Sequence, residues 1–196
     1  MWDERYSGKE YAYGTEPNDF LRSMADRLPV GKSLCLADGE GRNGVWLAQQ
    51  GHEVTAVDAS KVGLEKAKQL ALQRNVTIST IRCDLAQFEL GCEQWDLIVS
   101  IFCHLPPSLR CQVHHRAIRA LKPNGIFLLE AYTPAQLQYK TGGPPVVELM
   151  MDSQCLRREL HPLTLLHLEE RVRELNEGRL HQGQGAVVQL LARKEP

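Results

Sequence analysis

The feature of this sequence that most restricts its fold is a glycine-rich turn, residues 39–44, set between two short apolar stretches. The first stretch is Leu34–Ala37, and the second, Val54–Val57, ends in Asp58. A strand, a tight turn, a helix and a second strand in this order predict a β-α-β unit. Glycines in such a turn let the backbone bend sharply and lie closer to a ligand than a Cβ would allow.

The same unit predicts a nucleotide site. The helix after the turn directs its free N–H groups at whatever lies against the glycines. Asp58 follows Gly39 by about 20 residues, the spacing at which a carboxylate accepts hydrogen bonds from a ribose. We therefore expect an adenosine-containing cofactor.

Composition narrows the class of protein. The 196 residues are 43% hydrophobic and carry a formal net charge of −1, which indicates one domain, residues 1–196, without the basic surplus of nucleic-acid binders. No apolar run approaches the ~20 residues of a membrane span, and the polar N-terminus is no signal peptide. The six cysteines form no Cys-x-x-Cys pair. We expect reduced thiols in a cytoplasmic monomer without a membrane partner.

Strand-like and helix-like segments alternate along the first two thirds of the chain, which predicts an α/β fold with a parallel sheet covered on both faces. The expected strands are 34–37, 54–57, 76–82, 95–102 and 125–132, and the expected helices are 17–28, 42–50, 60–74 and 107–121. Residues 133–150 have the composition of a long functional loop. The apolar spacing of residues 165–176 by itself favours a helix, whereas residues 185–191 are typical of a strand.

Two cofactors satisfy the glycine pattern. Gly39-x-Gly41-x-x-Gly44 is a literal match to the dinucleotide fingerprint of NAD-binding proteins. A dinucleotide fold needs a second βαβαβ half, and too little chain remains for one. Asp84, at the end of the third expected strand, suits a different ligand, because a carboxylate there accepts from an adenine amino group.

The order and spacing of the motifs resemble class I S-adenosylmethionine-dependent methyltransferases, nearest to the small tellurite-resistance and thiopurine methyltransferase-like branch. The motifs are the glycine loop with Arg42-Asn43, Val57-Asp58-Ala59-Ser60, Cys83-Asp84-Leu85, Trp95-Asp96-Leu97-Ile98 and Leu121-Lys-Pro-Asn-Gly125. The resemblance implies a Rossmann-like, doubly wound, three-layer α/β/α fold. Its seven-stranded sheet has the order 3-2-1-4-5-7-6 with an antiparallel last strand. On that basis 165–176 and 183–193 become hairpin strands, against the helical spacing of the first.

The resemblance also implies S-adenosyl-L-methionine as cofactor and a set of cofactor-binding residues. These are Asp38, Gly39, Gly41, Arg42, Asn43, Asp58, Ala59, Cys83, Asp84, Leu85 and Ile101. Two positions depart from the family pattern, since Cys35 and Ala37 replace its usual acidic residue and glycine. Either Asp38 or backbone carbonyls then contact the ammonium group of the cofactor.

Two segments are expected at the mouth of the site. An N-terminal arm of about residues 1–20 carries Tyr6, Tyr11 and Tyr13, and acts either as an aromatic lid or as a packed structural arm. The loop of about residues 133–150 follows the fifth strand and is expected to line the substrate site. Because both lack a continuous apolar face, we expect weak packing of their own.

Tyr13 and His104 are the candidate catalytic residues. His104 follows the fourth strand, where it serves as a base or packs at the strand end. Cys111-x-x-His114 has metal-ligand spacing but falls in an expected helix, so no metal site is predicted. Glu130 is expected to pair with a neighbour, and the charges of residues 169–174 are expected to form a solvated face.

The function predicted is methylation of a small molecule, such as a thiol, a chalcogen oxyanion or a similar nucleophile. An acceptor that is already an anion needs no base, which is consistent with a sequence that shows no catalytic dyad. The alternatives are a non-catalytic module that binds S-adenosylmethionine and acts through partners, and a small NAD-dependent oxidoreductase.

Overall fold

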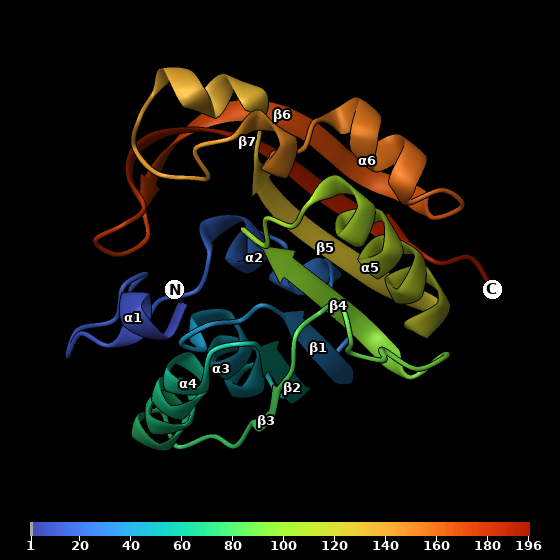
Figure 1. Cartoon of the computed structure of the whole chain (residues 1–196). Coiled ribbons are helices and arrows are strands. Elements are labelled where there is room, and N and C mark those ends of the chain that lie inside the picture. The colour runs from blue at the N-terminus through green and yellow to red at the C-terminus, as the bar shows by residue number, and fades with distance from the viewer. Residues whose placement is uncertain (1) are drawn as a thin grey trace.

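The computed structural model describes residues 2–196, whose strands form one seven-stranded sheet of order β3-β2-β1-β4-β5-β7-β6 (Figure 1). The strands are β1 Lys32–Leu36, β2 Glu53–Asp58, β3 Ser79–Arg82, β4 Trp95–Ile101, β5 Leu121–Tyr132, β6 Thr164–Asn176 and β7 Gln182–Arg193. β1 to β5 are parallel, and β7 runs antiparallel to both β5 and β6. The predicted Rossmann-like order and its antiparallel hairpin are therefore confirmed.

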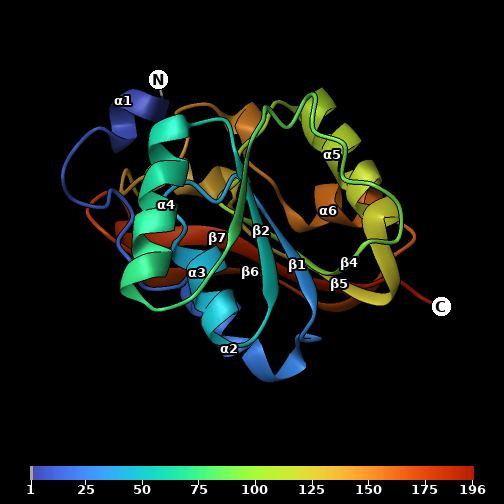
Figure 2. The same cartoon turned by 90° about the horizontal axis from the view of Figure 1, so that it is seen from below.

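Helices cover both faces of the sheet and produce the expected three layers (Figure 2). The helices are α1 Trp2–Tyr6, α2 Asp19–Ser23, α3 Arg42–Gln49, α4 Lys61–Gln73, α5 Pro107–Ala120 and α6 Ser153–Glu159. Alternate residues of each strand point to opposite faces. Leu34 and Phe127 pack in one core with residues of α5 and α6, whereas Cys35 and Leu128 pack in a second core with residues of α2 and α3.

Several element boundaries differ from the prediction. The expected helix 17–28 is two short pieces, α2 and a 3-10 turn at Ala25–Arg27. α2 begins at Asp19 because Asn18 caps it by accepting from the Leu21 N–H at 2.9 Å. The third strand covers only the end of the expected range 76–82, and β5 begins at Leu121 rather than Gly125. α6 was not predicted at all.

The hairpin of β6 and β7 shows why the helical spacing misleads. Pairing is continuous from Thr164 opposite Arg193 to Asn176 opposite Gln182, with one irregularity near Leu165. Val172, part of the helical stripe, is 45% exposed, whereas Leu175 is buried. Strand pairing thus prevails over the periodicity of the side chains.

The N-terminal arm is anchored at some positions and exposed at others, since residues 2–5 and 7–10 are exposed. Its weak packing stays a prediction, and its first residue, Met1, lies outside the described residues. Tyr6, Ala12, Phe20 and Leu21 are all buried. The Ala12 N–H donates to the Glu40 carboxylate at 2.7 Å.

Candidate active site

The glycine loop between β1 and α3 depends on left-handed backbone conformations. Gly39 and Gly41 have φ values of 59° and 86°. A Cβ on Gly41 would lie 2.5 Å from the Cβ of Ala67 in α4, so packing as well as conformation requires glycine there. Ala37, where the family pattern has glycine, also adopts a positive φ of 50°. The alanine thus takes up the left-handed conformation that a glycine adopts more readily.

Asp58 ends β2 directly beneath this loop. Its carboxylate accepts from the Gly39 N–H at 2.9 Å and the Ser60 N–H at 2.7 Å. Burial raises the pKa of Asp58, and these backbone donors oppose the rise. A carboxylate has about four acceptor positions, so hydroxyl groups can still bind beside the two amides.

Asp38 supplies a second carboxyl group on the other side of the loop, where it accepts from the Gly44 N–H at 3.2 Å. Burial, with a smaller contribution from Asp58, raises the pKa of Asp38 to about 7. Burial also raises the pKa of Cys35, which keeps this thiol neutral. Of the two, only Asp38 can therefore provide negative charge where the family pattern has an acidic residue in the preceding strand.

The predicted adenine-binding residues lie at the ends of β3 and β4 and after β2. Asp84 and Ala59 are exposed, and Cys83 is half-buried. Leu85 and Ile101 are 6% and 8% exposed. One oxygen of Asp84 accepts from the Ala86 N–H at 2.8 Å. A carboxylate acceptor beside apolar side chains suits the amino edge and the face of an adenine.

These residues fit S-adenosylmethionine. The Asp58 carboxylate keeps acceptor positions beyond the two backbone amides that it binds, and Asp84 after β3 is exposed, so both carboxylates remain free to accept from a ligand.

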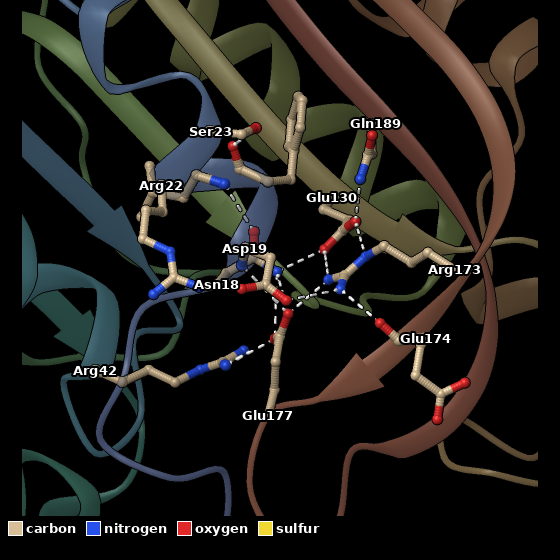
Figure 3. A network of polar contacts seen from close by, with 12 residues as sticks. Asn18, Asp19, Arg22, Ser23, Arg42, Glu130, Arg173, Glu174, Glu177 and Gln189 are labelled. Carbon is tan, nitrogen blue, oxygen red and sulfur yellow. Dashed lines mark hydrogen bonds and ion pairs between the residues drawn. The ribbon is translucent and has the colours of Figure 1, made fainter.

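Arg42, at the start of α3, points its side chain into a buried polar network (Figure 3), and Asn43 binds Asn18 of the same network. Arg42 pairs with Glu177 at 2.7 Å, and the Asn43 side chain accepts from the Asn18 N–H at 2.9 Å. Their predicted contribution to cofactor binding stays a prediction.

The centre of the network is a set of two buried carboxylates and one arginine. Arg173 of β6 donates to Glu130 of β5 at 2.7 and 2.9 Å and also to Glu177. Asn18 and Gln189 donate to Glu130 as well. Burial alone would raise the pKa of Glu177, but the two arginines hold it at about 2. Glu130 thus pairs with its neighbours, as expected, whereas the prediction of a fully solvated 169–174 face is wrong for Arg173.

The N-terminal arm lies over the glycine loop and the end of β2. Asp3 accepts from the Ser60 hydroxyl, and a Cβ on Gly39 would lie 2.6 Å from the Tyr6 hydroxyl oxygen. Burial raises the pKa of Tyr6. Glu40 also binds Lys66 of α4 at 2.7 Å. Sequence reasoning missed Glu40, although its place between two glycines of the loop was a usable signal.

Of the two candidate catalytic residues, His104 lies against the loop after β5, whereas Tyr13 lies near Tyr6 of the arm and His181. His104 Nδ1 is 2.9 Å from the Leu149 carbonyl oxygen, and its ring stacks on Tyr132 at 5.6 Å between centroids. The Tyr13 hydroxyl accepts from Arg5 at 3.0 Å, and its ring lies 4.5 Å from that of His181. No signal in the sequence had placed His181 here.

Two absences concern the part of the chain that is described. Residues 2–196 contain no group of three His, Cys, Asp or Glu side chains arranged to hold a metal ion. Over the same range, no helix has both the length and the hydropathy needed to cross a bilayer.

Comparisons with known proteins point to methyltransferases. Residues 34–125 match the methyltransferase domain family. The chain is 31% identical over 111 residues to an uncharacterized methyltransferase, YbaJ, of Bacillus subtilis, covering 56% of this chain and 44% of the relative. It is 24% identical over 142 residues to the 2-heptyl-1-hydroxyquinolin-4(1H)-one methyltransferase of Mycobacteroides abscessus, covering 70% and 63%. The chain thus spans less than two thirds of the length of these relatives.

Solved structures share the fold. TehB of Haemophilus influenzae superposes with a TM-score of 0.73 at 20% identity, covering 99% of this chain and 66% of that one. The N-methyltransferase NodS of Bradyrhizobium japonicum, in complex with S-adenosyl-L-homocysteine, gives a TM-score of 0.70 at 16% identity, covering 100% and 97%. The chain therefore has the class I methyltransferase fold, residues 34–125 match the methyltransferase domain, and the cofactor indicated is S-adenosylmethionine.

Proposed function

We propose that this protein transfers a methyl group from S-adenosylmethionine to a small nucleophilic molecule. The observation that carries the proposal is the glycine loop with Asp58 beneath it and Asp84 beside it, within a methyltransferase-domain match. The relative that methylates a hydroxyquinolinone supports a small acceptor. The formal net charge of −1 gives no support for a nucleic-acid substrate, and we propose a monomer.

Each carboxylate has one task in this proposal. Asp58 binds the ribose hydroxyls, Asp84 accepts from the adenine amino group, and Asp38 pairs with the ammonium group. The bound cofactor supplies an activated methyl group and its own leaving group, so the chain mainly orients the acceptor and excludes water. Tyr6 and the rest of the arm act as the cover that excludes water.

The acceptor belongs to the class of thiols, chalcogen oxyanions and similar small nucleophiles. A place in the tellurite-resistance and thiopurine methyltransferase-like branch is part of this proposal, and the fold similarity to TehB supports it.

The decisive experiment is a turnover assay. The purified protein is incubated with S-adenosylmethionine and a panel of a thiol, selenite, tellurite and a phenol, and formation of S-adenosylhomocysteine is measured. The proposal predicts acceptor-dependent product with at least one member. Tight cofactor binding without turnover on the whole panel would instead favour a binding module, and NAD-dependent hydride transfer would favour an oxidoreductase.

A further inference from the structure

Three side chains with buried, unpartnered polar atoms lie together where β4 and β5 end. Among the described residues, His104 Nε2, Tyr132 Oη and His181 Nδ1 have no hydrogen-bond partner. The ring of Tyr132 lies 5.6 Å from that of His104 and 5.7 Å from that of His181. Buried polar atoms are almost always paired in native proteins, so three orphans in one cluster point to a ligand that pairs with them.

The walls of this cluster are aromatic. The Phe102 ring lies 4.7 Å from that of Tyr132 and 4.6 Å from that of His181. Phe102 also adopts a positive φ of 51°, a strained conformation for a bulky residue that tends to occur at functional sites. Flat rings on several sides suit a flat ligand.

The hydrogen-bonding character of two orphan atoms is fixed. A carbonyl oxygen only accepts, so His104 Nδ1 carries the hydrogen that it donates to Leu149. Burial lowers the pKa of His104 to about 4, which leaves a neutral ring with a lone pair on Nε2. Burial raises the pKa of Tyr132, so its hydroxyl remains a donor. An acceptor and a donor side by side complement one hydroxyl group.

We propose that this cluster binds the methyl acceptor as a planar aromatic or heteroaromatic ring carrying a neutral hydroxyl group. The inference rests on the proposed function and narrows its substrate class. His104 Nε2 accepts the hydroxyl proton, and Tyr132 Oη donates to the hydroxyl oxygen. During transfer this oxygen forms the new bond to the methyl carbon, the carbon–sulfur bond breaks with its electron pair on sulfur, and the proton passes to His104.

Within the proposed class of small nucleophiles, the charge state of the cluster selects a neutral hydroxyl compound rather than a thiolate or a chalcogen oxyanion. Burial, with a contribution from Arg42, lowers the pKa of His181 to about 3, so all three polar side chains are uncharged at neutral pH. Arg42 and Arg173 are already bound to Glu177.

A turn made of Gly142 and Gly143 covers the cluster. A Cβ on Gly143 would lie 2.9 Å from the Tyr132 ring, and one on Gly142 would lie 3.2 Å from its hydroxyl oxygen. Both glycines belong to the 133–150 loop that follows β5. A ring that enters the cluster therefore displaces this turn.

The test uses 4-nitrophenol as probe, at a pH where it is neutral, with 4-nitroanisole, its methyl ether, as control ligand. Binding to the full chain is followed by absorbance, with and without S-adenosylhomocysteine. Tyr132→Phe and His104→Asn should each weaken 4-nitrophenol binding about 3–10-fold, as expected for one lost hydrogen bond. Asparagine keeps a donor for Leu149 while removing Nε2. His115→Asn, on the exposed side of α5, should change nothing.

Urea unfolding separates a ligand role from a structural role. Because Tyr132 Oη has no partner, Tyr132→Phe should leave the unfolding midpoint unchanged or raise it. Loss of stability with unchanged probe binding would overturn the inference, as would equal binding of 4-nitrophenol and its methyl ether. If S-adenosylhomocysteine binds but 4-nitrophenol does not, only this inference fails. If S-adenosylhomocysteine does not bind, the proposed function fails.

Discussion

The candidate active site has two halves, a cofactor half and an acceptor half, and their polar groups are paired in opposite ways. At the cofactor half, built on β1 to β3, backbone amides of Gly39, Gly44 and Ser60 engage the carboxyl groups of Asp38 and Asp58. At the acceptor half, near the ends of β4 and β5, His104 and Tyr132 leave buried polar atoms unpaired. The first half is organised in advance by the backbone, whereas the second is completed by its ligand.

The largest expected effect is on stability, because the buried polar network around Arg173 should be the main polar support of the β6–β7 hairpin. Arg173→Ala removes the partner of two buried carboxylates, and we expect a loss of about 3–5 kcal/mol in the free energy of unfolding. Arg171→Ala, whose side chain is 48% exposed, is the matched control and should cost less than about 0.5 kcal/mol. Urea unfolding of both variants checks this, and equal effects would contradict the role assigned to the network.

Asp58→Asn tests the cofactor half. The amide keeps the shape of the side chain but loses the charged acceptor, so we expect S-adenosylhomocysteine binding to weaken by about 1.5–3 kcal/mol. Calorimetric titration measures the affinity, and urea unfolding in parallel shows whether the fold is intact. An unchanged affinity in a folded variant would mean that the ribose lies elsewhere.

Asp38 should make stability depend on pH in an unusual direction. Burial raises its folded-state pKa from 3.8 to about 7, so between these values the folded protein holds a proton that the unfolded chain has lost. Its contribution therefore falls as pH rises through this window and levels off above about pH 7. Asp38→Asn should be about 1–3 kcal/mol more stable than the wild type at pH 8 and similar at pH 4. Unfolding curves across this range measure the difference, and a constant difference would be contrary evidence.

The same carboxyl links cofactor binding to protons. If Asp38 pairs with the ammonium group as an anion, binding near pH 6 releases a proton. The affinity for S-adenosylhomocysteine should then rise up to about pH 7, and Asp38→Asn should abolish that rise.

Ser60→Ala gives the smallest expected effect. Ser60 caps α4 by accepting from the Gly63 N–H at 3.0 Å, and its hydroxyl donates to Asp3 of the arm. Loss of the cap should cost about 1 kcal/mol in the free energy of unfolding. Amide exchange should also become faster in α1, because the arm loses this contact. Unchanged exchange in α1 would show that the Ser60 hydroxyl does not hold the arm in place.

The sequence predicts the cofactor half far better than the acceptor half, for a physical reason. Strand, glycine turn and strand-end carboxylate are local patterns, and Gly41 and Asp58 are close to one another in one β-α-β unit. His181 and Arg173 reach their partners through a hairpin, and nothing near them in the sequence indicates those partners. The stripe from Leu165 to Leu175 even has helical spacing, and only the family resemblance corrected it.

Calorimetric titration with S-adenosylhomocysteine and, separately, with NAD tests the central claim most directly. We expect one S-adenosylhomocysteine per chain and no binding of NAD, because the glycine loop and Asp58 are proposed to hold a single adenosine. Binding of NAD without S-adenosylhomocysteine, or of neither, would contradict the account.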